Sequence, residues 1–263
     1  MNQLYYQIKY ILYSLIVVVF CFFIVIAYYS LQLPDDTNLK NYKPDVMTRI
    51  HDSNGQLVKE FSREYRIFIP IEYIPDSLKN AFISAEDKNF YNHIGIDPTG
   101  IIRAIIRNTY YFFSDKRPEG ASTITQQVAK NFLLNDELSL SRKAKEALLA
   151  IKIDATLSKS RILELYLNQI YLGSGTYGVA AASNRYFKKS LKDLDLSEVS
   201  FLAALPKAPS RYNPKKNYDK SLSRRNWVLK RMFINNYISE NDYNDFVNTP
   251  ISSNLKIFPT RKL

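Results

Sequence analysis

The stretch Leu140–Leu157, LSRKAKEALLAIKIDATL, carries apolar residues on two sides of a helix. At 100° per residue, the first stripe consists of Ala144, Leu148, Ile151 and Ala155, and the second of Leu149, Ile153 and Leu157. A helix that is apolar on two faces is surrounded by other elements, so this segment predicts the centre of a helical domain. Glu146 projects into the second stripe, where a carboxylate is poorly solvated and requires a partner. Arg142, one turn earlier, is the nearest cation, and a purely structural Arg142–Glu146 pair is the simplest interpretation.

The helical pattern continues in both directions from this segment, from Asp76 almost to the C-terminus. Polar residues that can cap helix starts recur along it, namely Asp76, Asp97, Thr123, Ser141, Ser158, Ser197 and Ser239. Before Asp76, residues 49–75 are typical of short strands, with a turn at 52–55 and alternating Ile67, Ile69 and Ile71. We therefore expect a mainly α fold of roughly 170 to 190 residues with a small β element.

The N-terminal segment Tyr10–Leu33 contains no charged residue and is long enough to span a bilayer as a helix. A cleaved signal peptide is the alternative, but the apolar run is too long and no small-x-small site follows it. Lys9 before the span and Asp35 and Asp36 after it favour a cytoplasmic N-terminus. The predicted organisation is a cytoplasmic tail (1–9), a transmembrane signal anchor (10–33), a linker (34–48), an external domain (49–248) and a C-terminal tail (249–263).

Composition excludes several classes of protein. The 263 residues are 46% hydrophobic and include one cysteine and two histidines, which rules out a disulfide scaffold and a closed Cys/His zinc cluster. The formal charge of +11 suits anionic headgroups or phosphorylated substrates next to a membrane. Nucleic acid is disfavoured as a partner, because an anchored domain outside the cytoplasm does not meet it.

Glu86 is the first candidate catalytic residue. In a helix predicted over residues 77–95, Glu86 lies between Phe82 and Phe90 at the edge of the apolar stripe. Partial burial raises a carboxyl pKa and suits proton transfer, whereas Asp87 points to the other side of that helix. A salt bridge at the helix edge is the simpler alternative.

The second candidate site is the helix start in PEGASTITQQVAKNF, residues 118–132. Thr123 and Gln126 match a capping box. Thr123, Gln127 and Lys130 share one face, so free N–H groups, a hydroxyl and a cation could hold a phosphate. An ordinary capped helix with a solvated polar face is equally compatible with the spacing.

Five segments together resemble, in order and spacing, the motifs of the peptidoglycan glycosyltransferases, glycosyltransferase family 51. They are EDKNFYNHIG (86–95), GASTITQQVAKN (120–131), RKAKE (142–146), KSRILELYLNQIYLGSGTYGV (159–179) and RRNWVL (224–229). The resemblance runs from about Arg49 to about Val247 and is similar to the glycosyltransferase half of class A penicillin-binding proteins of the 1A type. It implies a lysozyme-like, two-lobed helical fold with a cleft at the bilayer surface.

The resemblance also implies an activity, the inverting polymerisation of lipid II with release of undecaprenyl pyrophosphate in cell wall biogenesis. Glu86 then corresponds to the general base and Glu146 to a second glutamate that assists at the pyrophosphate or orients the acceptor. The implied substrate-binding residues are Asp87, Phe90, His93, Ser122, Thr123, Gln126, Gln127, Lys130, Arg142 and Lys143. No cofactor is required by this interpretation, although Mg²⁺ or Mn²⁺ assists the pyrophosphate in some relatives.

The expected partners are lipid II, lipid-linked nascent glycan, the bilayer, and transpeptidases or other cell-wall synthesis proteins. The expected location is the bacterial plasma (inner) membrane, crossed once, with the catalytic domain on the periplasmic or extracellular face. Ser253 and Lys256 fit a Ser-x-x-Lys pattern, but only within a short polar tail, so no penicillin binding is expected. Two alternatives stay open, a non-catalytic membrane-anchored scaffold and a lysozyme-like enzyme that cleaves glycan.

Overall fold

The structure is a computed structural model that describes residues 2–33, 48–51, 53, 57–61, 65–111, 120–133 and 139–252. The predicted linker, the turn at 52–55 and the C-terminal tail lie mostly outside these residues. The described helices are α1 (Asn2–Ser30), α3 (Asp76–Glu86), α4 (Pro98–Tyr111), α5 (Ile124–Leu133), α6 (Leu140–Thr156), α7 (Lys159–Gln169), α8 (Val179–Phe187), α9 (Leu196–Ala204), α10 (Tyr218–Ile234) and α11 (Glu240–Val247). Short 3₁₀ helices are η1 (Ile71–Tyr73) and η2 (Leu191–Asp193). The strands are β1 (Thr48–His51), β2 (Leu57–Phe61), β3 (Tyr65–Arg66) and β4 (Thr176–Tyr177).

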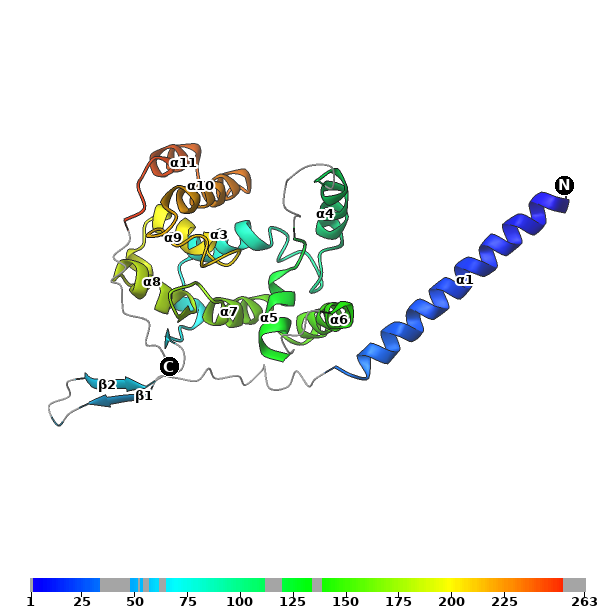
Figure 1. The fold of residues 1–263 in the computed structure, drawn as a ribbon, viewed down its shortest axis with the longest axis horizontal. Coiled ribbons are helices and arrows are strands. Elements are labelled where there is room, and N and C mark those ends of the chain that lie inside the picture. Colours follow the sequence, from blue (N-terminus) through cyan, green and yellow to red (C-terminus); the bar gives the residue numbers. More distant parts are fainter. Residues whose placement is uncertain are drawn as a thin grey trace.

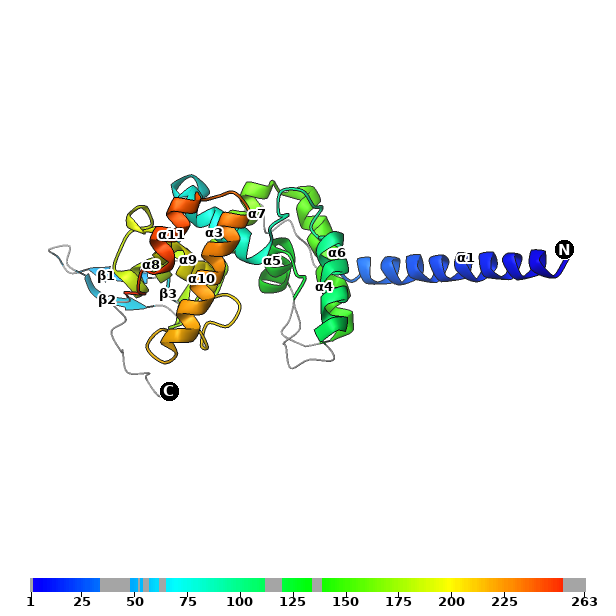
Figure 2. The ribbon, with the colours of Figure 1, turned by 90° about the horizontal axis from the view of Figure 1, so that it is seen from above.

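Helix α1 extends away from the helical domain, as Figures 1 and 2 show from two directions. Within the described part of the chain it is the one helix long and apolar enough to cross a membrane, over Tyr5–Ser30. Its side chains are largely exposed, with Tyr10 at 70% and Phe20 at 64% exposure. A helix that is hydrophobic all round and packs against little protein is compatible with a membrane anchor.

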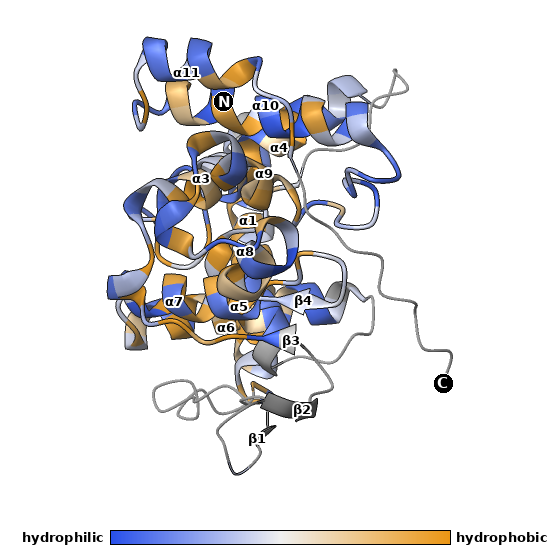
Figure 3. Cartoon of the chain, turned by 90° about the vertical axis from the view of Figure 1, so that its left-hand side faces the viewer, coloured by the Kyte–Doolittle hydropathy of each residue, from blue (hydrophilic) through white to orange (hydrophobic). Residues whose placement is uncertain are grey.

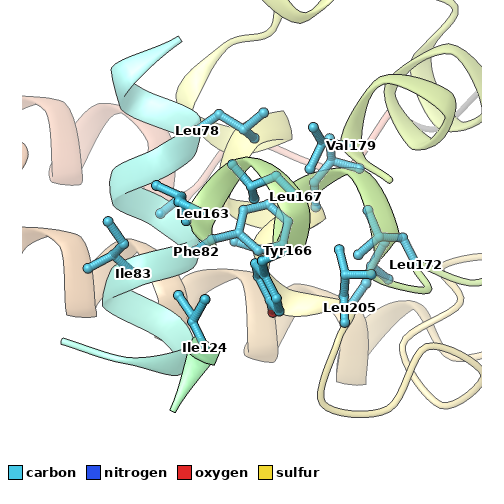
Figure 4. Packing of buried hydrophobic residues seen from close by; sticks show 14 of the residues in the cluster. Leu78, Phe82, Ile83, Ile124, Leu163, Tyr166, Leu167, Leu172, Val179 and Leu205 are labelled. Atoms are coloured by element: carbon cyan, nitrogen blue, oxygen red, sulfur yellow. The ribbon is translucent and has the colours of Figure 1, made fainter. Parts of the chain in front are cut away.

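The domain core lies between α3, α7 and α9. Phe82 of α3 and Tyr166 of α7 meet edge to face, with ring centroids 6.1 Å apart, and Figure 4 shows Leu78 and Leu163 packed around them. The last eight residues of α9, Ser197–Ala204, are all buried. Figure 3 shows α9 as more hydrophobic than α10 and α11, in which hydrophilic and hydrophobic turns alternate. The helical core predicted from the periodicity is therefore confirmed.

The β element is smaller than the alternating isoleucines predict. Strands β1 and β2 pair antiparallel, and β3 pairs parallel with β4 over two residues. The strand expected to run through Ile69 and Ile71 is absent from the described chain, where Ile71 begins η1. The Asn168 side chain accepts a hydrogen bond from the Ile69 amide and donates to the Ile69 carbonyl, both at 2.9 Å. These bonds satisfy the backbone that a neighbouring strand would otherwise pair.

Three of the predicted helix caps are wrong. Pro75 precedes α3 without a side-chain cap, so Asp76 is the first helical residue rather than its cap. Ser139, not Ser141, caps α6, and Asp195, not Ser197, caps α9 through a capping box with Glu198. For α6 and α9 an eligible side chain lies two residues nearer the N-terminus, and pattern alone does not choose between neighbours.

Gly95 fixes the contact between the segment after α3 and helix α6. Its φ is +91°, and a Cβ there would lie 2.3 Å from the carbonyl oxygen of Ala150. We expect Gly95→Ala to lower the free energy of unfolding by roughly 3 kcal/mol, because it adds both backbone strain and a backbone clash. Thermal and urea unfolding of the full chain measure this. Gly120→Ala is the control, since no atom of the described residues lies within 4 Å of its added Cβ, and an equal loss there would contradict the argument.

Candidate active site

Glu86 is the last residue of α3, and its carboxylate faces the first turn of α5. Gln127 donates a hydrogen bond from Nε2 to Glu86 Oε2 at 2.9 Å. Burial raises the pKa of the Glu86 carboxyl above its ordinary value, while the Gln127 bond acts in the opposite direction. A half-buried carboxylate with a raised pKa has the properties of a general base.

Asp87, the next residue, joins three segments of the chain. Its Oδ2 accepts the backbone N–H of Ile124 at 2.9 Å, which caps the start of α5, and lies 2.9 Å from His93 Nε2. The Gly95 amide donates to His93 Nδ1 at 3.1 Å, so that nitrogen carries no proton and Nε2 donates to Asp87. Asp87 therefore holds α3, α5 and the 87–95 segment together.

The helix predicted over residues 77–95 is therefore too long. It ends at Glu86, and Asp87 adopts φ −154° and ψ 74°, outside the helical region. Asp87 is also buried at 6% exposure rather than directed to the outer side of a helix. The physical reason is the pair of bonds from Ile124 and His93, which draws the carboxylate inward and bends the chain away from the helix axis.

Three of the predicted substrate-binding side chains are engaged inside the protein. Thr123 and Gln126 form the predicted capping box, with the Gln126 amide at 3.1 Å from Thr123 Oγ1 and the Thr123 amide at 3.0 Å from Gln126 Oε1. Thr123 also donates from Oγ1 to the Gly95 carbonyl at 2.6 Å. Phe90 is fully buried, with the Lys159 ammonium 4.9 Å from its ring centroid. These side chains contact other parts of the protein and stabilise the site. Their contact with substrate stays a prediction.

A second polar group lies where α6 meets the segment before α5. The Lys143 ammonium donates to Ser122 Oγ at 2.8 Å and pairs with the Glu146 carboxylate. The Glu146 side chain is 4% exposed, whereas that of Lys143 is 48% exposed. The buried carboxylate does have the partner that its position demands, but the partner is Lys143, not Arg142 as the helical spacing suggested.

Arg142 and Lys130 complete the predicted cationic group. Within the described residues, Nε and Nη1 of Arg142 are buried and make no hydrogen bond, so the guanidinium has donors available for an anion. Lys130 is exposed in the last turn of α5, one turn beyond Gln127. Helix α5 packs against α6, and its Gln127 bonds to Glu86 of α3, so α5 connects Glu86 with the helix that carries Arg142, Lys143 and Glu146.

Three residues that interact electrostatically with Glu86 were not assigned a role from the sequence: two act on its carboxyl, and the third is influenced by it. The positive charges of Arg224 and Lys207 lower the pKa of Glu86, and Glu86 raises that of the buried Tyr166 hydroxyl, for which burial is the larger cause. They belong to α10, to the segment after α9, and to α7. The motif RRNWVL pointed to Arg224, but nothing in the local pattern around Lys207 or Tyr166 indicates proximity to Glu86.

Within the part of the chain that the structure describes, no group of three or more His, Cys, Asp or Glu side chains is placed to hold a metal ion. The side chains around Glu146 are predominantly cationic or neutral, a donor set that does not suit Mg²⁺ or Mn²⁺.

Comparison with known proteins identifies the family. The family model described as transglycosylase matches residues 54–233, so the chain belongs to the transglycosylase family. This confirms the family, the fold class and the glycosyltransferase enzyme class predicted from the motifs. Penicillin-binding protein 1A of Rickettsia bellii is 51% identical over 228 residues, and that of Escherichia coli strain K12 is 41% identical over 253 residues.

The matched regions cover much of this chain but little of its relatives. They span 87% of this chain and 29% of the Rickettsia bellii protein, and 94% of this chain and 29% of the Escherichia coli protein. Among solved structures, penicillin-binding protein 1A from Haemophilus influenzae matches with a TM-score of 0.48 and 28% identity. That match covers 84% of this chain and 23% of that chain. The chain thus spans less than a third of the length of these relatives.

Proposed function

We propose that the chain polymerises lipid II into glycan strands, with the lipid-linked nascent glycan as donor and undecaprenyl pyrophosphate as leaving group. The observation that carries the proposal is the Glu86–Gln127 contact at 2.9 Å, because it joins a carboxylate of raised pKa to α5, the helix that carries Lys130 and packs against α6 with Arg142 and Lys143. This arrangement supports a single displacement, in which a base activates the acceptor and cations stabilise the departing pyrophosphate.

Glu86 is the proposed general base. It removes the proton from the acceptor 4-hydroxyl as that oxygen attacks the anomeric carbon of the donor, which inverts its configuration. Burial makes the carboxylate more basic than an exposed one, and the Gln127 bond fixes its orientation. A single displacement requires no covalent intermediate on a side chain, so no residue of the site is assigned the role of nucleophile.

The pyrophosphate is proposed to bind between Lys130, Arg142 and Lys143. The Arg142 nitrogens that have no hydrogen-bond partner among the described residues supply directed donors, and Lys143 is half exposed at the surface of the group. Glu146 orients Lys143 and, through it, Ser122. Glu146 is therefore a positioning residue for the groups that stabilise the leaving pyrophosphate. Its carboxylate is too deeply buried to replace Glu86 as the base.

No resident cofactor forms part of the proposal. The cationic side chains themselves neutralise the leaving group, and they repel a divalent ion. A Mg²⁺ or Mn²⁺ ion that assists the reaction would be held mainly by oxygens of the pyrophosphate, because Glu146 is the one carboxylate proposed at that position.

The proposed location is the bacterial inner membrane, with the N-terminus in the cytoplasm and the domain on the outer face. Two apolar surfaces support a membrane-bound position. One is α1, and the other is an exposed face of α4 formed by Ile102, Ile105, Ile106 and Tyr110, each at least 59% exposed. Isoleucines exposed together are unusual on a protein surrounded by water, and we assign this face to the bilayer that holds the lipid-linked substrate.

The test is polymerisation of lipid II by the detergent-solubilised full chain, with products separated by glycan length. We expect glycan strands longer than the starting disaccharide, formed with release of undecaprenyl pyrophosphate. Substrate binding without any product, by protein that is folded, would overturn the proposal and favour the scaffold. Release of soluble fragments from preformed glycan would favour a glycan-cleaving enzyme instead.

A further inference from the structure

Trp227 lies on α10 between two arginines that are one helical turn away on either side. The Arg224 guanidinium carbon is 3.8 Å from the Trp227 ring centroid, and that of Arg231 is 5.9 Å away. The first distance is that of a guanidinium stacked on the ring, an arrangement stabilised by attraction between the cation and the π face. Trp227 is 40% exposed, so the ring lies at the surface and covers Arg224 from the solvent side.

Arg224 has an unusual environment for a charged residue. It is 9% exposed, and its Nε is buried without a hydrogen-bond partner within the described residues. Arginine is seldom buried unless it is paired, because removing the charge from water costs free energy. No ion pair of Arg224 is found in the described chain, where the guanidinium stacks on the Trp227 ring and is also stabilised by the charge of Glu86.

Arg224 lies toward the carboxyl end of α3. Helix α10 packs against α3, and the charges of Arg224 and Glu86 act on each other in both directions. Arg224 is the strongest of the charged groups that act on Glu86. A guanidinium that approaches the base without pairing with it favours the ionised carboxylate and leaves its oxygens free to accept the proton.

Other groups face Glu86 from the remaining elements around it. Gln127 of α5 donates a hydrogen bond, Lys207 after α9 adds a second positive charge, and the neighbouring Asp87 adds a negative one. Tyr166 of α7 is buried nearby and its pKa is raised, so its hydroxyl is uncharged at neutral pH. Gln127, Lys207 and Asp87 all remain when Arg224 moves, so the loss of Arg224 should change the proton affinity of Glu86 only in part.

We propose that Trp227 is a positioning residue for the general base, and that its ring holds the Arg224 guanidinium where its charge keeps Glu86 ionised. This inference rests on the proposed function, since it concerns the same carboxylate. It gives the exposed tryptophan a part in the reaction without any contact with substrate.

The experiment compares pH profiles of kcat/KM for lipid II polymerisation by the full chain in detergent. Trp227→Leu keeps apolar bulk but removes the π face, and should move the acid limb upward by roughly 0.5 pH unit, a loss of about threefold below the limb. Trp227→Phe keeps a π face and should stay near wild type. Arg224→Gln should shift the limb in the same direction, and Trp227→Leu should add nothing in that background.

Arg231→Gln is the matched control, because Arg231 flanks the same ring but is not among the charges that act on Glu86. An unchanged limb in Trp227→Leu, an equal shift in Arg231→Gln, or additive shifts in the double variant would overturn the inference. A ¹³C titration of the Glu86 carboxyl, assigned by comparison with Glu86→Gln, separates the two proposals. If the Glu86 titration shifts in the variants but the wild type makes no glycan, the proposed function is contradicted and the inference stands. If the wild type makes glycan but the Glu86 titration does not shift in the variants, only the inference is contradicted.

Discussion

Glu86→Gln is expected to abolish glycan formation while leaving the protein folded and able to bind lipid II. A positioned general base contributes roughly 10² to 10⁴ in rate, so polymerisation should fall by about that factor or below detection. The glutamine side chain still has an oxygen that can accept the hydrogen bond from Gln127 Nε2, observed at 2.9 Å in the wild type. The substitution therefore preserves this contact and removes only the capacity to accept a proton. Product analysis and lipid II binding measured on the same preparation separate loss of catalysis from loss of substrate.

The same substitution should stabilise the protein at neutral pH. Burial raises the pKa of folded Glu86 above that of the unfolded chain, so ionisation favours unfolding. The contribution of this group to stability is complete below its ordinary pKa and is lost as pH rises through the raised value. Glutamine cannot ionise, so the Tm of Glu86→Gln should exceed that of wild type near pH 7.5 and approach it in acid.

Glu72→Gln, on the exposed face of η1, is the control for both measurements. It should polymerise lipid II at the wild-type rate, and its Tm should not depend on pH differently from wild type. A Glu86→Gln variant that retains wild-type polymerisation would remove Glu86 from the role of base, and a Tm below that of wild type at neutral pH would contradict the burial argument.

Local features of the site could be predicted from the sequence because they depend on near neighbours. The capping box of Thr123 and Gln126 spans one helical turn, and the structure confirms both of its hydrogen bonds. The burial of Glu146 followed from the apolar stripe around it and is also confirmed. Its partner could not be chosen, since Arg142 and Lys143 are both within reach of one turn. In the structure, the Lys143 ammonium that pairs with Glu146 also donates to Ser122, which lies 21 residues away in the sequence.

The features that were not predicted correctly depend on contacts between residues that are distant in sequence. Periodicity extends α3 to residue 95, because Phe82 and Phe90 have helical spacing and both are buried. What ends the helix is the bond between Asp87 and the Ile124 amide, 37 residues later. Arg224 is farther still from Glu86 along the chain, so its approach could only emerge from the packing of α10 on α3. A single sequence predicts which residues form a helix better than which helices meet.

Asp87→Asn is the second substitution with a large expected effect, and it acts on structure and activity together. The buried carboxylate accepts from both the Ile124 amide and His93. An asparagine oxygen accepts these bonds more weakly, and its NH₂ group has to be accommodated among donors. Bonds to a charged acceptor contribute about 1.5 to 3 kcal/mol, so we expect the free energy of unfolding to fall by roughly 2 kcal/mol and Tm by roughly 5 °C.

Activity should fall further than this loss of stability explains. The Ile124 amide begins α5, and Gln127 lies in the first turn of the same helix, where it orients Glu86. Releasing that helix start displaces the donor that holds the base, and a misplacement of about 1 Å is worth roughly 10² in rate. Polymerisation measured well below Tm should therefore drop about 100-fold.

Asp76→Asn is the matched control at the other end of α3, where Asp76 is 85% exposed and pairs with Lys79 at the surface. Such a pair contributes under about 1 kcal/mol, so Asp76→Asn should retain wild-type polymerisation and nearly wild-type Tm. If both variants behave alike, Asp87 does not connect the general base to the start of α5, and the 87–95 segment must be held by its remaining bonds alone.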